Sequence, residues 1–301
     1  MIGQTVIGRV VEEQKNYFLL DTEQGVVLAT RKGTLKKENT RVSVGDLVDV
    51  HINDPQEKKG IITAIKPRRN LLPRPALANM DQILFVNAYY EPLLDLGTVD
   101  KFLFSASVYG FAVHLVFNKS DLLDEEGSAE LLEIEQLYCG LGYTCSRTSI
   151  HDEVSIAALR GQCAAKVSSF AGVSGVGKSA LINLLVPDLN QPTNELSRYF
   201  NKGVHTTTAA SLHAIPQGGY IADTPGFALL TMPRIDEREV VAHFPEFSAA
   251  LGHCRFNNCV HQNEPGCAVL EAVEAGVIAR TRLEHFHLIR KELTGLRKEY
   301  R

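Results

Sequence analysis

The sequence lacks any apolar stretch long enough to cross a membrane. Its longest apolar runs, residues 83–88 and 111–117, fall far short of the ~20 residues that a transmembrane helix needs. The N-terminus also lacks the basic start, apolar stretch and small-residue cleavage site of an export signal. A cytoplasmic protein without a membrane partner is therefore expected.

Cysteine is scarce, and a reducing cytoplasm argues against reading the six cysteines as disulfides. Cysteines that cluster in such a compartment indicate thiol chemistry or metal binding. Cys254, Cys259 and Cys267 cluster, whereas the other three are scattered along the chain.

Length and composition indicate a globular protein with more than one core. The 301 residues are 45% hydrophobic, 22% charged and 7% aromatic, and roughly 100 to 200 residues per domain predict two or three domains. The net charge of -4 is unevenly spread, because residues 1–74 hold thirteen Lys and Arg against nine Asp and Glu. A basic N-terminal end suggests a polyanionic partner, although a solvated loop explains residues 31–41 equally well.

The N-terminal region alternates between polar and apolar residues in five short segments that end near residue 66. Five short strands predict a small β-barrel of the OB-fold type, whose surface commonly binds nucleic acid. A barrel without a ligand is the alternative. Three prolines in residues 66–81 mark a linker, which places a domain boundary near residue 70.

From residue 81 onward, apolar strands alternate with helices expected around 99–109 and 129–137, and two more strands are expected at 208–215 and 218–226. This pattern predicts an α/β domain over 71–234, with a mostly parallel sheet covered by helices on both faces. Residues 235–301 contain the cysteine cluster and helical patterns but no strand signal, so a third, helical domain is expected there.

The strongest motif is GVSGVGKS, which follows an apolar strand and opens a helix. It matches the phosphate-binding P-loop, in which glycines let backbone N–H groups face phosphates, the lysine reaches the terminal phosphates and the serine binds Mg²⁺. The predicted phosphate site comprises Gly172, Val173, Ser174, Gly175, Val176, Gly177, Lys178 and Ser179.

The N-K-x-D pattern of Asn118, Lys119 and Asp121 follows a second buried strand. A carboxylate at Asp121 can accept hydrogen bonds from both the ring N–H and the exocyclic amine of guanine, whereas adenine offers no such pair. The Lys119 stem can lie along the base plane, and Asn118 can tie this loop to the P-loop. Together with the P-loop, the pattern favours GTP over ATP.

A third strand ends at Asp223, which is expected to hold Mg²⁺ through water, and the Gly226 N–H is expected to sense the terminal phosphate. Thr207, in the HTTT segment, is expected to complete the Mg²⁺ shell. Phe227 occupies the position where many GTPases carry a water-orienting glutamine. His205 is the nearest polar candidate for that catalytic role, and an RNA contact or a solvated side chain are the alternatives.

The motif order is permuted, because Asp121 precedes Lys178 by more than fifty residues. Chain termini that lie close together at a domain surface make such circular permutation tolerable. Thr148 and Ser149 then fall where a loop supporting guanine is expected.

Four residues of the C-terminal region carry the spacing of a metal site. Three thiolates and one imidazole in a reducing compartment predict a tetrahedral zinc site, with one Zn²⁺ per chain. The predicted ligands are Cys254, Cys259, His261 and Cys267. His51, His253, His285 and His287 are expected to be surface or helix-face residues.

The order of a basic barrel, NKSD, GVSGVGKS, HTTT, DTPG and a Cys/Cys/His/Cys set resembles the RsgA (YjeQ) family of bacterial ribosome-assembly GTPases over effectively the whole chain. The resemblance implies binding to the small ribosomal subunit and its rRNA late in maturation, followed by release. It also implies that the subunit stimulates Mg²⁺-dependent hydrolysis of GTP to GDP. A monomer is expected, although the sequence itself does not give the oligomeric state. The family usually has arginine before the histidine of HTTT, but here Val204 stands there, which puts the role of that arginine in doubt.

Two other functions fit parts of the pattern. A zinc-stabilised RNA-binding scaffold, in which the nucleotide only sets conformation, would show no subunit-stimulated phosphate release. A P-loop ATPase or small-molecule kinase is disfavoured by Asp121, and competition between GTP and ATP would separate it.

Overall fold

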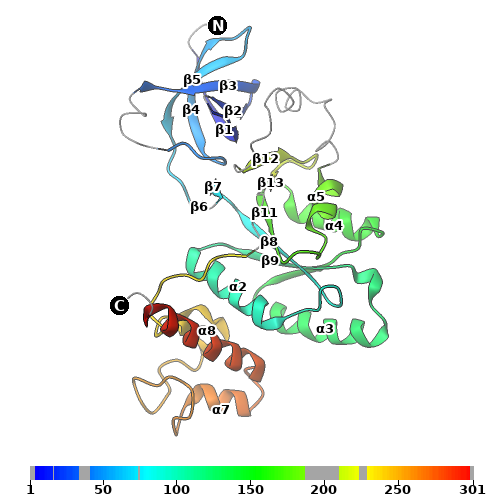
Figure 1. Cartoon of the computed structure of the whole chain (residues 1–301), viewed down its shortest axis with the longest axis vertical. Helices are drawn as coiled ribbons and strands as arrows, with labels where there is room; N and C mark the ends of the chain where they lie inside the picture. The colour runs from blue at the N-terminus through cyan, green and yellow to red at the C-terminus, as the bar shows by residue number, and fades with distance from the viewer. Residues whose placement is uncertain are drawn as a thin grey trace.

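The computed structural model describes residues 4–15, 17–33, 41–73, 75–186, 210–223 and 229–298. A β-barrel, an α/β layer and a helical unit follow one another along the long axis of the molecule, in chain order (Figure 1). Among these residues, no helix combines the length and apolarity needed to span a membrane.

Five strands form the N-terminal barrel. They are β1 (Thr5–Glu13), β2 (Phe18–Thr22), β3 (Gly25–Arg31), β4 (Leu47–Asp54) and β5 (Lys59–Ile65). They run in the order β1-β2-β3-β5-β4, and antiparallel pairing between β1 and β4 closes the barrel. Side chains alternate along each strand, so Val48, Val50 and Ile52 enter the barrel core while their neighbours remain accessible. The predicted barrel is confirmed.

Within the described part of the chain, the central sheet contains six strands in the order β10-β9-β8-β11-β13-β12. They are β8 (Gln82–Ala88), β9 (Val113–Asn118), β10 (Thr144–Arg147), β11 (Val167–Ala171), β12 (Ser211–Ala214) and β13 (Tyr220–Asp223). All neighbours pair in parallel except β12 and β13. A short hairpin, β6 (Leu71–Pro73) and β7 (Ala76–Ala78), precedes this sheet.

Helices cover both faces of this sheet, which is why every residue of β8 is buried. The helices are α2 (Leu96–Tyr109), α3 (Glu125–Gly140), α4 (Glu153–Cys163) and α5 (Lys178–Leu185). Ile83 and Phe85 belong to the core that α2 and α3 complete, whereas Leu84 and Val86 belong to the core under α4 and α5. The two helices α2 and α3 begin earlier than the sequence pattern indicated, because Asp95 and Asp124 cap them with side-chain hydrogen bonds.

In residues 229–298, which form the C-terminal unit, the named elements are all helical, and irregular segments join them. Its elements are the 3₁₀ turns η2 (Val240–His243) and η3 (Pro245–Phe247) and the helices α7 (Ala268–Glu274) and α8 (Arg280–Lys298). Phe244, Phe247 and Phe286 form its aromatic centre, with ring centroids 5.0 to 5.4 Å apart.

The barrel and the α/β layer share one continuous sheet. Strand β1 pairs with β12 through Glu12 and Ser211, so the barrel strands extend the edge of the central sheet. The Tyr220 hydroxyl donates to Asp21 at 2.5 Å, and the Arg9 guanidinium lies 5.4 Å from the Tyr220 ring centroid. The contact is therefore made by backbone pairing together with a polar and aromatic cluster.

Candidate nucleotide and zinc sites

The glycine-rich loop lies between β11 and α5, as its sequence predicts, and two of its glycines cannot be replaced without collision. Gly177 has a φ of 95°, and a Cβ there would lie 2.3 Å from Asn118 Nδ2. A Cβ on Gly172, at φ 140°, would lie 2.2 Å from the carbonyl oxygen of Val86. Both positions combine positive φ with close approach, the two conditions that require glycine.

Lys178 turns back over the loop that precedes it. Its ammonium donates to the carbonyl oxygens of Gly172 and Val173 at 2.6 and 2.8 Å, and burial lowers its pKa. Ser179 follows in the first turn of α5 and is exposed. The lysine therefore lies across the mouth of the loop, at the helix N-terminus where anions are favoured.

Asn118 joins the N-K-S-D segment to the glycine-rich loop. This residue ends β9 and is buried, and its Nδ2 donates to the Val176 carbonyl at 2.8 Å. Its Oδ1 accepts from the Thr148 hydroxyl at 2.9 Å. Two segments almost sixty residues apart are thus fixed to each other by a single buried amide.

Asp121 is held by a serine that the sequence indicated only through its position after β10. The Ser149 hydroxyl donates to Asp121 Oδ1 at 2.5 Å, and this bond is the largest cause of the lowered pKa of Asp121. The Ser149 oxygen in turn accepts from the His151 N–H at 3.1 Å. The carboxylate therefore stays ionised and fixed in orientation at neutral pH.

Asn118, Asp121 and Gly177 border one cavity of about 260 Å³. Its lining consists of Asn118, Lys119, Asp121, Leu122, Ile150, His151, Gly177 and Ala180. Ile150 and His151 were not predicted as site residues. They directly follow Thr148 and Ser149, so their position in the same loop could have indicated that they line the cavity. Lys119 adopts φ 61° and its ammonium donates to the Glu91 carbonyl at 2.8 Å, so its stem borders the cavity.

Asp223 ends β13, beside β11, whose last residue precedes the glycine-rich loop. Because these strands are parallel neighbours, their carboxyl ends meet at the same edge of the sheet. The predicted residues Thr207, His205 and Gly226, and also Val204 and Phe227, lie outside the described residues.

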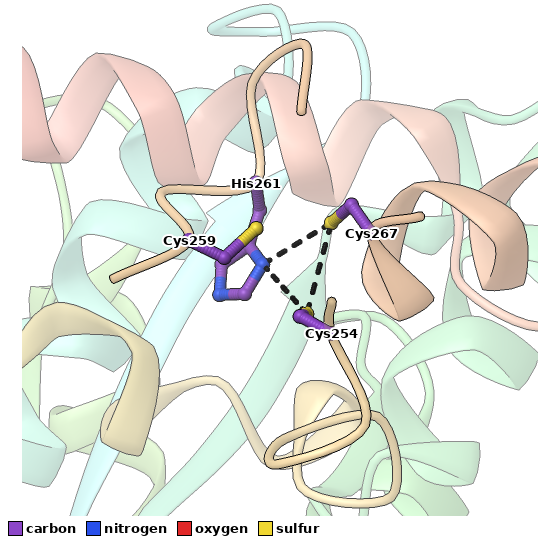
Figure 2. A group of neighbouring side chains, drawn as sticks. All are labelled: Cys254, Cys259, His261 and Cys267. Atoms are coloured by element: carbon purple, nitrogen blue, oxygen red, sulfur yellow. Dashed lines mark hydrogen bonds between the residues drawn. The ribbon is translucent and has the colours of Figure 1, made fainter. Parts of the chain in front are cut away.

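The four predicted zinc ligands meet at one point in the C-terminal unit (Figure 2). All four ligand atoms lie within 4.8 Å of one another. Cys254 Sγ lies 3.9 Å from Cys267 Sγ and 3.7 Å from His261 Nδ1, and His261 Nδ1 lies 3.3 Å from Cys267 Sγ. Tetrahedral Zn²⁺ with ordinary Zn–S and Zn–N bonds places its ligand atoms about 3.6 to 3.8 Å apart. The donor set and its spacing therefore fit zinc.

Hydrogen bonds outside the four side chains hold the ligand loop in shape. Glu264 accepts the N–H groups of Val260, Gln262 and Asn263 at 2.8 to 3.0 Å. Desolvation opposes ionisation of Glu264, but these backbone bonds outweigh it and lower its pKa to about 2. The expectation for His287 was incomplete, because it is half-buried on α8 and its Nε2 lies 3.0 Å from the His261 carbonyl.

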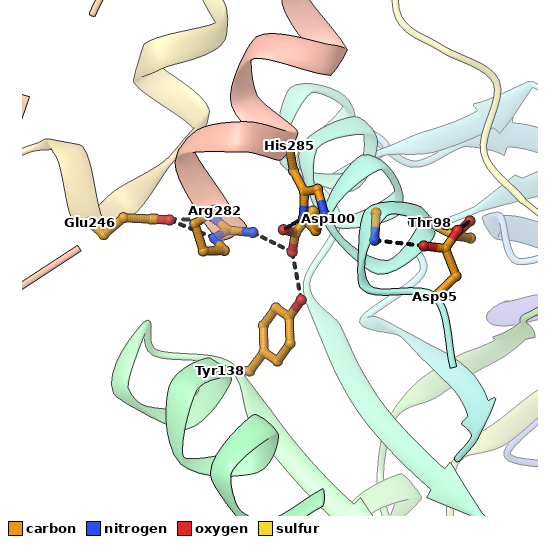
Figure 3. A network of polar contacts seen from close by, with 8 residues as sticks. Asp95, Thr98, Asp100, Tyr138, Glu246, Arg282 and His285 are labelled. Carbon is orange, nitrogen blue, oxygen red and sulfur yellow. Dashed lines mark hydrogen bonds and ion pairs between the residues drawn. The ribbon is translucent and has the colours of Figure 1, made fainter. Parts of the chain in front are cut away.

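A buried charge network joins the C-terminal unit to α2 (Figure 3). The Arg282 guanidinium, 2% exposed, donates to Asp100 and Glu246, each at 2.5 Å. Asp100 also accepts from the Tyr138 hydroxyl at 2.7 Å and lies 2.6 Å from His285 Nδ1. His285 lies on a helix face as expected, but it contacts this network rather than solvent alone. Burial disfavours the charged guanidinium, yet the two carboxylates raise the pKa of Arg282.

The sheet order, the glycine-rich loop and an N-K-x-D segment that precedes this loop in the chain define a circularly permuted P-loop GTPase. The crystal structure of YloQ, titled a circularly permuted GTPase, superposes with a TM-score of 0.81 at 27% identity, covering 97% of this chain and 96% of YloQ. The crystal structure of YjeQ from Thermotoga maritima gives a TM-score of 0.83 at 35% identity, covering 97% of this chain and 99% of that one. The predicted fold class is confirmed.

The family model described as RsgA GTPase matches residues 65–233. The small ribosomal subunit biogenesis GTPase RsgA of Moorella thermoacetica is 39% identical over 279 residues, which are 93% of this chain and 94% of that relative. The protein of the same name from Gemmatimonas aurantiaca is 39% identical over 302 residues, with 96% and 97% covered. This chain belongs to the RsgA family of GTPases.

Proposed function

We propose that this GTPase binds GTP with Mg²⁺ at the cavity beside the glycine-rich loop and hydrolyses it while bound to the maturing small ribosomal subunit. The observation that carries the proposal is the hydrogen bond from Asn118 Nδ2 to the Val176 carbonyl, which brings the N-K-S-D segment to the P-loop. The names of the relatives, small ribosomal subunit biogenesis GTPases, supply the partner.

Base choice is assigned to Asp121. Its two carboxylate oxygens accept from the ring N–H and the exocyclic amine of guanine, while the stem of Lys119 covers the base plane. Ser149 acts as a positioning residue for Asp121, because its hydroxyl bonds one of these oxygens without closing the cavity. Adenine offers no such pair of donors, so it would leave the carboxylate incompletely paired, which is costly.

The phosphates are assigned to the backbone N–H groups of residues 172–179 and to Lys178. When GTP binds, the Lys178 ammonium would exchange the carbonyls of Gly172 and Val173 for phosphate oxygens. Ser179, Thr207 and, through water, Asp223 would hold Mg²⁺, which neutralises charge on the phosphates. Gly226 would donate its N–H to the terminal phosphate.

We assign to His205 the role of positioning the attacking water or acting as its base, since Phe227 cannot orient water by hydrogen bonding. A positioned acid or base contributes about 10² to 10⁴ in rate. His205→Ala should bind GTP and the subunit normally but lower stimulated turnover at least about tenfold. Near wild-type stimulated turnover would exclude the catalytic role and leave an RNA contact.

The division of labour follows the three units, 1–70, 71–234 and 235–301. The barrel would contact rRNA, supported by Arg31, whose guanidinium lies 5.7 Å from the Phe18 ring centroid, and by the neighbouring Lys32. Residues 34–40, which hold the rest of the basic patch, lie outside the described residues. The third unit would be stabilised by one Zn²⁺. The protein would act as a monomer in the cytoplasm, where subunits assemble.

The decisive experiment measures GTP hydrolysis by the zinc-loaded full chain with and without purified small subunits. Stimulation by the subunit is expected for the wild type and is expected to vanish in Lys178→Ala, which removes the phosphate contact. Hydrolysis that ignores the subunit would contradict the proposed role, and GTP binding without stimulated phosphate release would favour a zinc-stabilised RNA-binding scaffold. Competition of ATP with GTP tests the base assignment separately.

A further inference from the structure

The segment that joins β8 to α2, residues 89–95, borders the nucleotide site but belongs to none of the predicted motifs. The Lys119 ammonium donates to the Glu91 carbonyl of this segment at 2.8 Å. A Cβ on Gly175 would lie 3.8 Å from Pro92 Cδ, so the next residue of the segment lies against the glycine-rich loop. The segment therefore connects the lysine of N-K-S-D to the P-loop.

The bond to Glu91 determines where the Lys119 side chain ends. Lys119 lines the cavity of about 260 Å³, so its stem runs along the wall between its own backbone and Glu91. This stem is the part that would lie along the guanine plane. A lysine side chain loses much rotamer freedom when it is ordered, so a stem that is fixed before GTP arrives lowers the cost of binding.

Tyr90 anchors the segment one residue before Glu91. Its hydroxyl donates to Asp124 Oδ1 at 2.7 Å. Asp124 is the N-cap of α3, and the same oxygen accepts from the Gly127 N–H at 2.8 Å. The bond from Tyr90 is the largest cause of the lowered pKa of Asp124, so the acceptor is ionised at neutral pH. The segment is thus attached to the first turn of α3.

Gly127 makes room for the Tyr90 hydroxyl. A Cβ at this position would lie 2.5 Å from Tyr90 Oη and 2.9 Å from Tyr90 Cζ. Glycine is less favourable than alanine in a helix, and the φ of Gly127 is not positive, so the backbone does not require it. The close approach of Tyr90 accounts for glycine here.

We propose that Tyr90 is a positioning residue for guanine recognition, an inference that rests on the proposed function. Its bond to Asp124 fixes the segment, and the Glu91 carbonyl then fixes the Lys119 ammonium. The Lys119 stem is thereby held in place to cover the base. If Tyr90 only stabilised α3, its removal would not depend on Lys119.

Displacement of a fluorescent guanine nucleotide from the zinc-loaded full chain tests this dependence. Tyr90→Phe should bind GTP about three- to tenfold more weakly, the range for loss of one hydrogen bond. In the Lys119→Ala background the same change should cause no further loss, because the positioned stem is absent. The affinity for Mg²⁺-tripolyphosphate, which has phosphates but no base, should be the same in Tyr90→Phe and the wild type.

Two further variants complete the test. Gly127→Ala displaces the same hydroxyl and should reproduce the loss of GTP affinity. Tyr89→Phe is the matched control, because the Tyr89 hydroxyl donates to a different carboxylate of α3, that of Glu130. This control should bind GTP as the wild type does.

The outcomes separate this inference from the proposed function. A loss in Tyr90→Phe and Gly127→Ala that is absent from Tyr89→Phe and from the Lys119→Ala background supports it. Unchanged GTP affinity in Tyr90→Phe would overturn it, as would an equal loss for tripolyphosphate, an equal loss in Tyr89→Phe or an additive loss with Lys119→Ala. These results would leave the proposed function intact. If the wild type binds no GTP, the proposed function fails together with this inference.

Discussion

Replacing Ser149 by alanine tests whether the orientation of Asp121 determines guanine affinity. The change removes the hydroxyl that donates to Asp121 Oδ1 at 2.5 Å and leaves the cavity lining, to which Ser149 does not belong, in place. Asp121 remains ionised at neutral pH in the variant, because an ordinary aspartate pKa lies near 4. The expected effect is therefore one of position rather than of charge.

The size of the effect follows from the bond and its exposure. A hydrogen bond to a charged group contributes about 1.5 to 3 kcal/mol, and the exposed position of Asp121 selects the lower end because solvent screens the charge. About 1.4 kcal/mol corresponds to a tenfold change in affinity. Ser149→Ala should therefore bind GTP and GDP about tenfold more weakly, while the ratio of GTP to GDP affinity stays constant.

Displacement of a fluorescent guanine nucleotide measures this change. Ser149→Thr, which keeps a hydroxyl, should recover most of the affinity. Ser155→Ala is the matched control, because Ser155 accepts from the Ser149 N–H at 3.2 Å but makes no contact with Asp121 among the described residues. Wild-type affinity in Ser149→Ala, or an equal loss in Ser155→Ala, would refute the positioning role.

Three further changes test separate parts of the molecule. Asp121→Asn should shift preference from GTP toward XTP, because an amide matches the ring N–H and 2-oxo group of xanthine. Competition binding measures this shift, and unchanged GTP affinity would show that Asp121 does not contact the base. Cys259→Ser should lose zinc and loosen residues 250–275, while nucleotide binding persists. Metal analysis would measure the zinc and hydrogen exchange the loosening. Wild-type protein that is purified without chelator and contains no zinc would contradict the zinc assignment. Burial, aided by Lys166, lowers the pKa of His114 to about 4. His114 stabilisation should therefore be complete above pH 6.5 and decline as the pH falls toward 4. A loss of about 2 kcal/mol in unfolding free energy is expected between about pH 7.5 and pH 5. Denaturant titration at both values should show a flatter profile for His114→Gln, and an equally steep profile would contradict this role.

Local patterns predicted the parts of the structure that depend on neighbours in the chain. The strand before Gly172 and the helix after Lys178 fix the loop between them, so the glycine-rich loop could be placed from sequence. The zinc set could be predicted because thiols and an imidazole within fourteen residues have few other uses in a reducing compartment.

Contacts between distant segments could not be predicted in the same way. In the sequence, Arg282 is one of many charged residues in a helix that is expected to face solvent. It becomes a buried partner of Asp100 only because α8 packs against α2. The bond from Ser149 to Asp121 likewise requires β9 and β10 to be parallel neighbours, which places the loops after them side by side. The sequence position of Ser149 indicates a loop that supports guanine but not its bond to Asp121, and Arg282 carries no spacing signal at all, since both partners are set by the tertiary fold.

The pairing of β1 with β12 gives the barrel a mechanical link to the nucleotide end of the sheet. Asp223 of β13 lies opposite Ser211 of β12, and Ser211 lies opposite Glu12 of β1, so one row of residues crosses from the predicted Mg²⁺ position into the barrel. A slip of β12 by one residue would turn its side chains to the other face of the sheet. If the hairpin of β12 and β13 is displaced, either the barrel must move with it as a rigid body or the pairing between β1 and β12 must break.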